Sequence, residues 1–244
     1  MNYFYILVFF FVLSMLYFVH GLNGSANDWK KYIDFFSKKG FECKAIDLQK
    51  GVDLRKAHIT DYIDKVCFHV GKDDVVIGHS MGGLIMQKVA ERIELKAGIG
   101  ICSAPPRGIA LDSISWWKQI RYIPYMLLGI PFKPSFRLVR NVFLSGWSEK
   151  RQRKIYQQLR KQSAYVTYEV MKQQISVDEK KISAPLYFIG RKNDVTIPVD
   201  VIRNIADKYH SSYDVVDGNH YIFIDWKKVA EKILVFLQKI NRVT

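Results

Sequence analysis

Runs of apolar residues alternate along this chain with segments in which apolar positions recur every three or four residues. The helical pattern is clearest over residues 25–40, 59–71, 82–93 and 226–240. Strands are predicted between these segments, at residues 15–20, 41–48, 74–78, 97–104, 184–190 and 212–218, and most of them have a continuous apolar character. Apolar strands separated by helices are typical of a parallel sheet covered on both faces. The pattern therefore predicts an α/β fold with a mostly parallel central sheet and helices on both of its faces.

The segment 25–40 illustrates the helical pattern. Ser25 is followed three residues later by Asp28, which is the spacing of a capping box at a helix N-terminus. The residues that follow form one apolar stripe at helical spacing, made of Trp29, Tyr32, Ile33 and Phe36. We expect this stripe to face the core.

The alternation breaks between residues 105 and 179, a stretch longer than an ordinary loop. We expect a helical insertion here, lying over the end of the sheet, while residues 1–104 and 180–244 form the core. The basic part of the insertion, residues 148–162, is interpreted as the solvated face of a helix. Aromatic and apolar side chains earlier in the insertion are expected to pack within it, namely Trp116, Trp117, Tyr122, Tyr125 and Met126.

The N-terminal residues 3–19 are uncharged and almost wholly apolar, as in a signal sequence, a membrane anchor or a buried strand. A signal peptide should begin with Lys or Arg, but only Met1 and Asn2 precede this run. Its aromatic and β-branched residues favour a strand, which we place at residues 15–20. Residues 1–13 stay open as strand, anchor or signal remnant. We expect a cytoplasmic protein, with attachment to a membrane through this segment as the alternative.

The charge of the chain indicates which partners it favours. The 244 residues are 49% hydrophobic, enough for one large core, and Lys and Arg outnumber Asp and Glu by 37 to 23. The resulting net charge of +14 predicts weak association with an anionic membrane surface. Nucleic acid is not expected as a partner, since no zinc-finger spacing or RNP-like motif accompanies the charge. The three cysteines, Cys43, Cys67 and Cys102, lack disulfide or zinc spacing and are interpreted as reduced core residues.

The stretch VVIGHSMGG, residues 75–83, carries the chemistry that is easiest to interpret. An apolar strand leads into Gly78-His-Ser80-Met-Gly82, and a helical pattern follows. This is the context of a nucleophile elbow, a sharp turn that holds a serine hydroxyl outward. Glycines are needed because side chains would clash across so tight a bend. We therefore predict that Ser80 is a nucleophile, and His79 is expected to pack or form a hydrogen bond.

A serine nucleophile needs a base, and the base needs an orienting carboxylate. His220 follows a predicted strand in a glycine-containing loop, and Asp194 follows the strand before it. The order Ser80, Asp194, His220 is the one that accompanies this elbow. Asp217 is the competing acid, but it precedes the histidine loop and is more typical of a turn.

The motifs FVHGLNG, GHSMGG, GRKNDVTIP and DGNHYIF together resemble the α/β-hydrolase fold family, in particular its serine esterase, lipase and thioesterase branch. The resemblance extends from about residue 15 to the C-terminus. It implies that the backbone N–H groups of Leu22 and Met81 form the oxyanion hole. It also implies that the insertion is a cap over the acyl pocket.

We therefore expect a serine hydrolase that cleaves carboxylic esters or thioesters, with a small-molecule acyl ester of lipophilic character as substrate. A peptidase or an acyltransferase of the same fold is the alternative within this class, and a non-catalytic binding module the alternative outside it. No cofactor and no metal is expected, because the sequence has no HExxH, Walker or dinucleotide motif.

Overall fold

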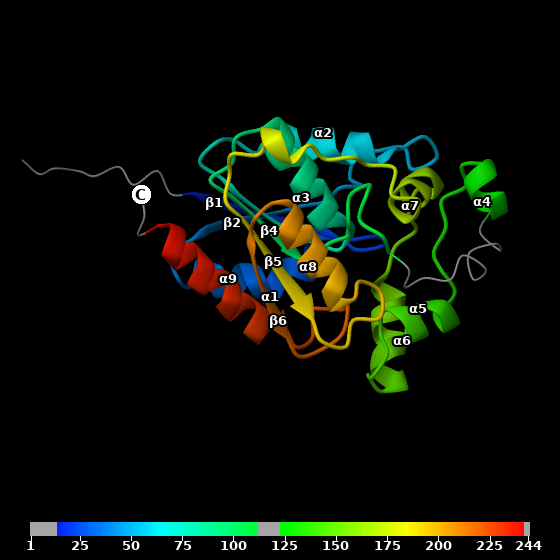
Figure 1. The fold of residues 1–244 in the computed structure, drawn as a ribbon. Coiled ribbons are helices and arrows are strands. Elements are labelled where there is room, and N and C mark those ends of the chain that lie inside the picture. Colours follow the sequence, from blue (N-terminus) through cyan, green and yellow to red (C-terminus); the bar gives the residue numbers. More distant parts are fainter. Residues whose placement is uncertain (1–13, 112–122, 242–244) are drawn as a thin grey trace, which may run out of the picture.

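A computed structural model of the chain describes residues 14–111 and 123–241. Its centre is a sheet of six strands in the order β2-β1-β3-β4-β5-β6, and every neighbouring pair is parallel (Figure 1). The strands are β1 (Met15–Val19), β2 (Glu42–Ile46), β3 (Val75–His79), β4 (Ala97–Ile101), β5 (Leu186–Arg191) and β6 (Ser212–Val216). This confirms the predicted α/β class, and all six predicted strands are present.

Helices cover both faces of the sheet, as the continuous apolar strands predicted. One face packs against α2 (Ile59–His69), α3 (Met81–Arg92) and α8 (Val199–Lys208). The opposite face packs against η1 (Ala26–Trp29), α1 (Lys30–Ser37) and α9 (Lys227–Ile240). Helix α8 was not predicted, although Val201, Ile202 and Ile205 form its buried side. Its ten residues directly after Pro198 are too short a segment to show the helical pattern clearly.

Strand β1 lies inside the sheet, between β2 and β3. Its side chains alternate between the two cores, with Leu16 and Phe18 in one and Tyr17 and Val19 in the other. The prediction of a strand immediately before His20 is therefore confirmed. Residues 1–13, for which strand, anchor and signal remnant were open, lie outside the described residues. Within the described residues, no helix is long and apolar enough to cross a membrane.

The apolar stripe of the first helical segment packs as predicted. Trp29, Tyr32 and Phe36 are fully buried, and the Phe18 ring lies 5.0 Å from the Trp29 ring, centroid to centroid. The backbone N–H of Ser25 donates to the Asp28 carboxylate over 2.8 Å, as a capping box requires. This aromatic cluster fixes the chain where it leaves β1 and the turn that follows.

The predicted insertion is helical in the part that the structure describes. It contains α4 (Ile123–Leu127), α5 (Phe136–Val142), α6 (Glu149–Gln158) and α7 (Ala164–Met171), and the short η3 (Glu179–Lys181) lies at its C-terminal boundary. Figure 1 shows α4 to α7 grouped beyond one end of the sheet. The basic helix α6 buries only Gln152 and Ile155, so most of it is a solvated face. The expected packing of Trp116, Trp117 and Tyr122, and of the Met126 side chain, falls outside the described residues.

The three cysteines are free thiols. Only Cys102 is fully buried, whereas Cys43 and Cys67 are half-buried. The expectation that all three belong to the core is therefore wrong for two of them. Cys43 lies on the edge strand β2, and Cys67 points from α2 toward the periphery of the core. An apolar neighbourhood in the sequence does not distinguish these positions from the core.

Candidate active site

The serine of GHSMG occupies a strained turn between β3 and α3. Ser80 has φ 55° and ψ −119°, a conformation that non-glycine residues rarely adopt. Its backbone N–H donates to the carbonyl of Ile101 over 3.0 Å, which holds the turn against the end of β4. The helix α3 begins at the next residue, so its N-terminal dipole end lies beneath the hydroxyl.

The glycines on either side of Ser80 are required by close backbone contacts. A Cβ on Gly78 would lie 2.0 Å from the carbonyl oxygen of Gly82. A Cβ on Gly82 would lie 2.3 Å from the carbonyl oxygen of Val19. The strand, the turn and the first turn of α3 thus pack backbone against backbone, as the motif predicted.

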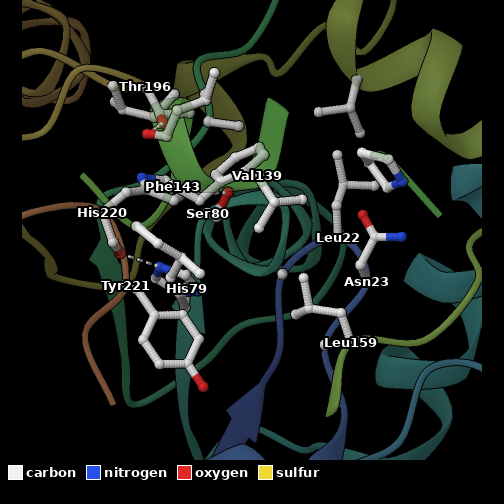
Figure 2. A pocket seen from close by; sticks show the side chains of 18 of the residues that line it. Leu22, Asn23, His79, Ser80, Val139, Phe143, Leu159, Thr196, His220 and Tyr221 are labelled. Carbon is white, nitrogen blue, oxygen red and sulfur yellow. Dashed lines mark hydrogen bonds between the residues drawn. The ribbon is translucent and has the colours of Figure 1, made fainter. Parts of the chain in front are cut away.

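The structure brings Ser80, His220 and Asp194 together from three separate loops. Nε2 of His220 lies 3.0 Å from Oγ of Ser80, and Nδ1 lies 2.7 Å from Oδ2 of Asp194. His220 and Asp194 are buried, while Ser80 is half-exposed to the pocket (Figure 2). In this arrangement the imidazole can take a proton from the serine hydroxyl, and the carboxylate can hold the ring in the tautomer that does so.

The environment of Asp194 favours its ionised form. Burial by itself raises the pKa of this carboxyl, but the neighbouring His220 and the backbone N–H groups of Ile197 and Thr196 outweigh it and lower the pKa. Both N–H groups donate to Oδ1, that of Thr196 over 2.8 Å and that of Ile197 over 2.9 Å. The competing acid Asp217 is exposed and lies 3.7 Å from the Lys228 ammonium, away from this cluster.

His79, beside the serine, is a supporting residue. Its Nε2 donates to the backbone carbonyl of His220 over 2.9 Å, which holds the loop that carries the imidazole. Burial, together with the nearby His220, lowers the pKa of His79 to about 3, so the ring is neutral. The expectation that His79 packs and forms a hydrogen bond is confirmed.

The turn after β1 lies directly against the serine. A Cβ on Gly21 would be 3.0 Å from the Cβ of Ser80, closer than ordinary van der Waals contact, so a larger residue would require its neighbours to shift. Leu22 follows on this turn, and Met81 follows Ser80. Among the hydrogen bonds of the described residues, none uses the backbone N–H of Leu22 or Met81. Both groups therefore have the capacity to donate to a ligand atom beside the serine.

Ser80 lines a pocket with a cavity volume of about 160 Å³. Its apolar wall comes largely from the insertion, with contributions from Phe132, Leu138, Val139, Val142, Phe143, Leu144, Ile155, Leu159, Val170 and Met171. Figure 2 shows Val139, Phe143 and Leu159 among the side chains that line the pocket. Apolar residues form most of the lining, and Ser80 and His220 are among its few polar residues. This polarity is expected for a site that takes an apolar chain attached to a polar reacting group.

Comparison with known proteins identifies the family of this chain. Residues 16–232 match the model of the alpha/beta hydrolase family. The chain belongs to the alpha/beta hydrolase family. Together with its structural neighbours, this membership supports a hydrolase activity.

Several solved structures share the alpha/beta hydrolase architecture with this chain. An extracellular alpha/beta-hydrolase from a Paenibacillus species has a TM-score of 0.74 and 17% identity, covering 91% of this chain and 98% of its own. A carboxylesterase of Nitrososphaera gargenis has a TM-score of 0.72 and 16% identity, and the match covers 96% of this chain and 93% of the carboxylesterase. A lipase-esterase related protein from Clostridium acetobutylicum has a TM-score of 0.69 and 20% identity, and the match covers 91% of this chain and 94% of that protein. At these identities the likeness concerns the fold. No curated protein sequence matches the chain significantly.

A buried thiol lies behind the acid of this alpha/beta hydrolase site. The ligand atoms of Cys102, Asp194 and His220 all lie within 4.8 Å of one another, a spacing that could also suit a metal ion. Both Asp194 oxygens, however, already accept hydrogen bonds from the protein. Burial, followed by the charge and hydrogen bond of Asp194, raises the pKa of Cys102 well above its usual value. The thiol is therefore protonated, which suits a neighbour of a carboxylate better than a metal ligand.

Arg191, at the end of β5, was missed as part of the site. Its side chain is completely buried and forms an ion pair with Asp225 beneath the loop that carries His220. Gly218 of that loop has φ +126°, and a Cβ there would overlap the guanidinium. A hydrogen bond joins this loop to the loop that carries Asp194, because the Asn193 N–H donates to the Gly218 carbonyl over 2.9 Å. A lone arginine at a strand end has no sequence signal that reveals such burial.

Proposed function

We propose that this protein is a serine hydrolase that cleaves carboxylic esters or thioesters through an acyl-enzyme. The observation that carries the proposal is the chain of short contacts from Ser80 Oγ to His220 Nε2 and from His220 Nδ1 to Asp194. A strained serine at a strand-to-helix turn adds support, because the turn presents the hydroxyl to the pocket. The fold of the family and of its esterase neighbours agrees with this chemistry.

In the first half of the reaction, His220 takes the proton of Ser80 as the serine oxygen attacks the carbonyl carbon. The carbonyl oxygen becomes an oxyanion, for which the N–H groups of Leu22 and Met81 are the proposed donors. His220 then gives its proton to the departing alcohol or thiol, and the acyl group stays on the serine. Removal of one such donor in a serine hydrolase costs about 10²–10³ in kcat, so these two groups are expected to supply a large part of the rate enhancement.

In the second half, His220 takes a proton from water, and the resulting hydroxide equivalent attacks the acyl carbon. The tetrahedral intermediate collapses, the carboxylic acid leaves, and Ser80 regains its proton from His220. Asp194 stays ionised throughout and stabilises the imidazolium that forms twice in each cycle. The lowered pKa of Asp194 supports this role.

The substrate we propose is a lipophilic acyl ester, with residues 105–179 as the cap that encloses its acyl chain. The apolar wall formed by α5, α6 and α7 supports both points, because it extends from the serine with few polar groups. A hydrocarbon chain gains about 0.8 kcal/mol per buried CH₂ group, so such a wall favours longer acyl chains.

The nucleophile is tested with a fluorophosphonate probe and a chromogenic ester. We expect the probe to label the wild-type protein at Ser80. Ser80→Ala should lose labelling and several orders of magnitude in turnover while keeping its circular dichroism spectrum. Ser176→Ala, at an exposed serine outside the pocket, is the matched control and should behave as wild type. Near-normal turnover of Ser80→Ala would show that the assignment is wrong.

The acyl pocket is tested with p-nitrophenyl esters of increasing chain length. Val142→Phe adds bulk to a half-buried wall residue and should lower kcat/KM for long chains by about tenfold relative to acetate. Val235→Phe, at an exposed position of α9, is the matched control and should leave the chain-length profile unchanged. An unchanged profile for Val142→Phe would place the acyl chain elsewhere.

A further inference from the structure

The short segment that joins α6 to α7 reaches back from the insertion to the turn after β1. The backbone N–H of Arg160 donates to the carbonyl of Asn23 over 2.9 Å, and the Asn23 side-chain amide donates to the carbonyl of Arg160 over 2.9 Å. Asn23 directly follows Leu22, the first proposed oxyanion donor. The insertion is therefore joined to this turn by two reciprocal hydrogen bonds.

The guanidinium of Arg160 extends the same connection to a third segment. Its Nε donates to the carbonyl of Gly24 over 3.2 Å, and its two terminal nitrogens donate to the two oxygens of Asp47 over 2.9 and 2.7 Å. Asp47 directly follows β2. Although burial alone raises the pKa of Asp47, the hydrogen bond and charge of Arg160 lower it below its usual value. A bidentate, half-buried pair of this kind orients both groups more strictly than an exposed ion pair does.

The backbone that Arg160 contacts is one that needs support. Asn23 has φ 61° and is buried, a left-handed conformation that surrounding contacts must maintain. The described contacts of its amide and its carbonyl are both with Arg160. Because Leu22 precedes this residue, loosening Asn23 would change where the Leu22 N–H points.

Two residues further on, Gln162 reaches the other side of the proposed oxyanion hole. Its amide Nε2 lies 3.8 Å from the sulfur of Met81, the second proposed donor residue. Its Oε1 accepts from the hydroxyl of Tyr62 over 3.1 Å and from Gln49, so this fully buried amide is fixed in orientation. One segment of the insertion thus contacts the residue that follows Leu22 and the side chain of Met81.

We propose that Arg160 and Gln162 are positioning residues that set the geometry of the oxyanion hole and couple the placement of the insertion to catalysis. The inference rests on the proposed function, because it takes Leu22 and Met81 as the donors. Neither side chain lines the pocket, so neither touches the substrate. If the segment moves away, the turn loses its support and the hole is no longer ordered.

The test compares substrate binding with transition-state stabilisation in Arg160→Ala. We expect kcat for a chromogenic ester to fall about 10- to 100-fold. This fall in kcat is at most similar to the fall that follows removal of one oxyanion donor. KM should change less than about threefold, because the apolar wall formed by α5, α6 and α7 is left unchanged. An alkyl boronic acid, whose tetrahedral adduct with Ser80 mimics the intermediate, should bind more weakly by the same factor as kcat/KM falls. Arg153→Ala, on exposed α6, is the matched control and should leave all three values unchanged.

A second variant separates positioning from folding. Arg160→Lys keeps the charge but cannot contact Gly24 and both Asp47 oxygens together, so it should give an intermediate loss in kcat and in boronic acid affinity. Folding is monitored by urea titration, and kinetics are measured where each variant is fully folded. Full kcat in both folded variants, or a rise in KM alone, would overturn the inference. If Ser80→Ala stays active, the proposed function itself fails; if Ser80→Ala is inactive while Arg160→Ala and Arg160→Lys keep full kcat, only the positioning role fails.

Discussion

The carboxylate of Asp194 lies 2.7 Å from Nδ1 of His220, and both side chains are buried. Twenty-six residues separate them in the chain, and they meet because β5 and β6 are adjacent parallel strands whose carboxyl ends lie at the same edge of the sheet. This is the edge at which open α/β sheets build their sites.

Replacing the acid by its amide should preserve the fold and damage catalysis. We expect Asp194→Asn to lower kcat on the order of 10⁴, the loss that follows in another serine hydrolase when the imidazole is held in the wrong tautomer. Steady-state hydrolysis of an activated ester measures it. Asp217→Asn is the matched control, since that carboxylate is exposed beside Lys228, and it should retain normal activity. The reverse pattern would identify Asp217 as the acid.

The elbow should not tolerate a methyl group at Gly82. In Gly82→Ala the new Cβ would lie 2.3 Å from the carbonyl oxygen of Val19, the last residue of β1. Because both contacting groups are backbone, β1 or α3 would have to shift as a whole to relieve the clash. We expect a loss of at least about 2 kcal/mol in the free energy of unfolding, together with loss of activity. Gly71→Ala provides the comparison, since the nearest atom to its Cβ is 3.8 Å away. Equal urea midpoints for the two variants would contradict the close packing of the elbow.

Acidification should destabilise the protein through its buried histidines. Burial lowers the pKa of His20 to about 4 and that of His79 to about 3, both from about 6.5. The unfolded state therefore binds protons that the folded state does not, so stability is full above pH 6.5 and falls as the pH drops toward 4. Each histidine contributes a slope of up to about 1.4 kcal/mol per pH unit.

This pH dependence is measured by urea unfolding between pH 7 and pH 4.5. In the wild-type protein, the backbone N–H of Leu48 donates a hydrogen bond to Nε2 of His20. His20→Gln keeps an acceptor for this N–H group. This variant should reduce the slope by the contribution of one histidine. An unchanged slope would mean that His20 is not the group whose protonation is linked to unfolding.

Truncation should distinguish the strand β1 from the residues before it. A chain lacking residues 1–20 loses the strand that pairs with both β2 and β3, and we expect no folded protein. A chain that begins at Ser14 keeps the strand and should fold, as judged by circular dichroism and size-exclusion chromatography. A folded and active chain that begins at Gly21 would show that β1 is dispensable and would remove the basis for Leu22 as an oxyanion donor.

The alternation of strands and helices and the position of the elbow follow from the amino-acid sequence alone. Both depend on local requirements: apolar runs mark strands that are buried on both faces, and a serine between glycines marks a turn in which side chains would clash. The same local logic pointed to Asp194 and His220, because each directly follows an apolar strand. It did not reveal α8, whose pattern is short, or the half-exposure of Cys43 and Cys67, which depends on what packs beside them.

The distant side chains that support the site become apparent only in the folded chain. Arg160 and Asp47 are separated by 113 residues and Arg191 and Asp225 by 34, and no sequence pattern links the two members of either pair. A charged residue next to other charged residues predicts a solvated surface, and the stretch around Arg160 was interpreted in that way. Such a side chain can contact water or form an ion pair with a carboxylate. Which of the two occurs depends on how the insertion packs over the end of the sheet, and therefore on contacts between segments far apart in the chain.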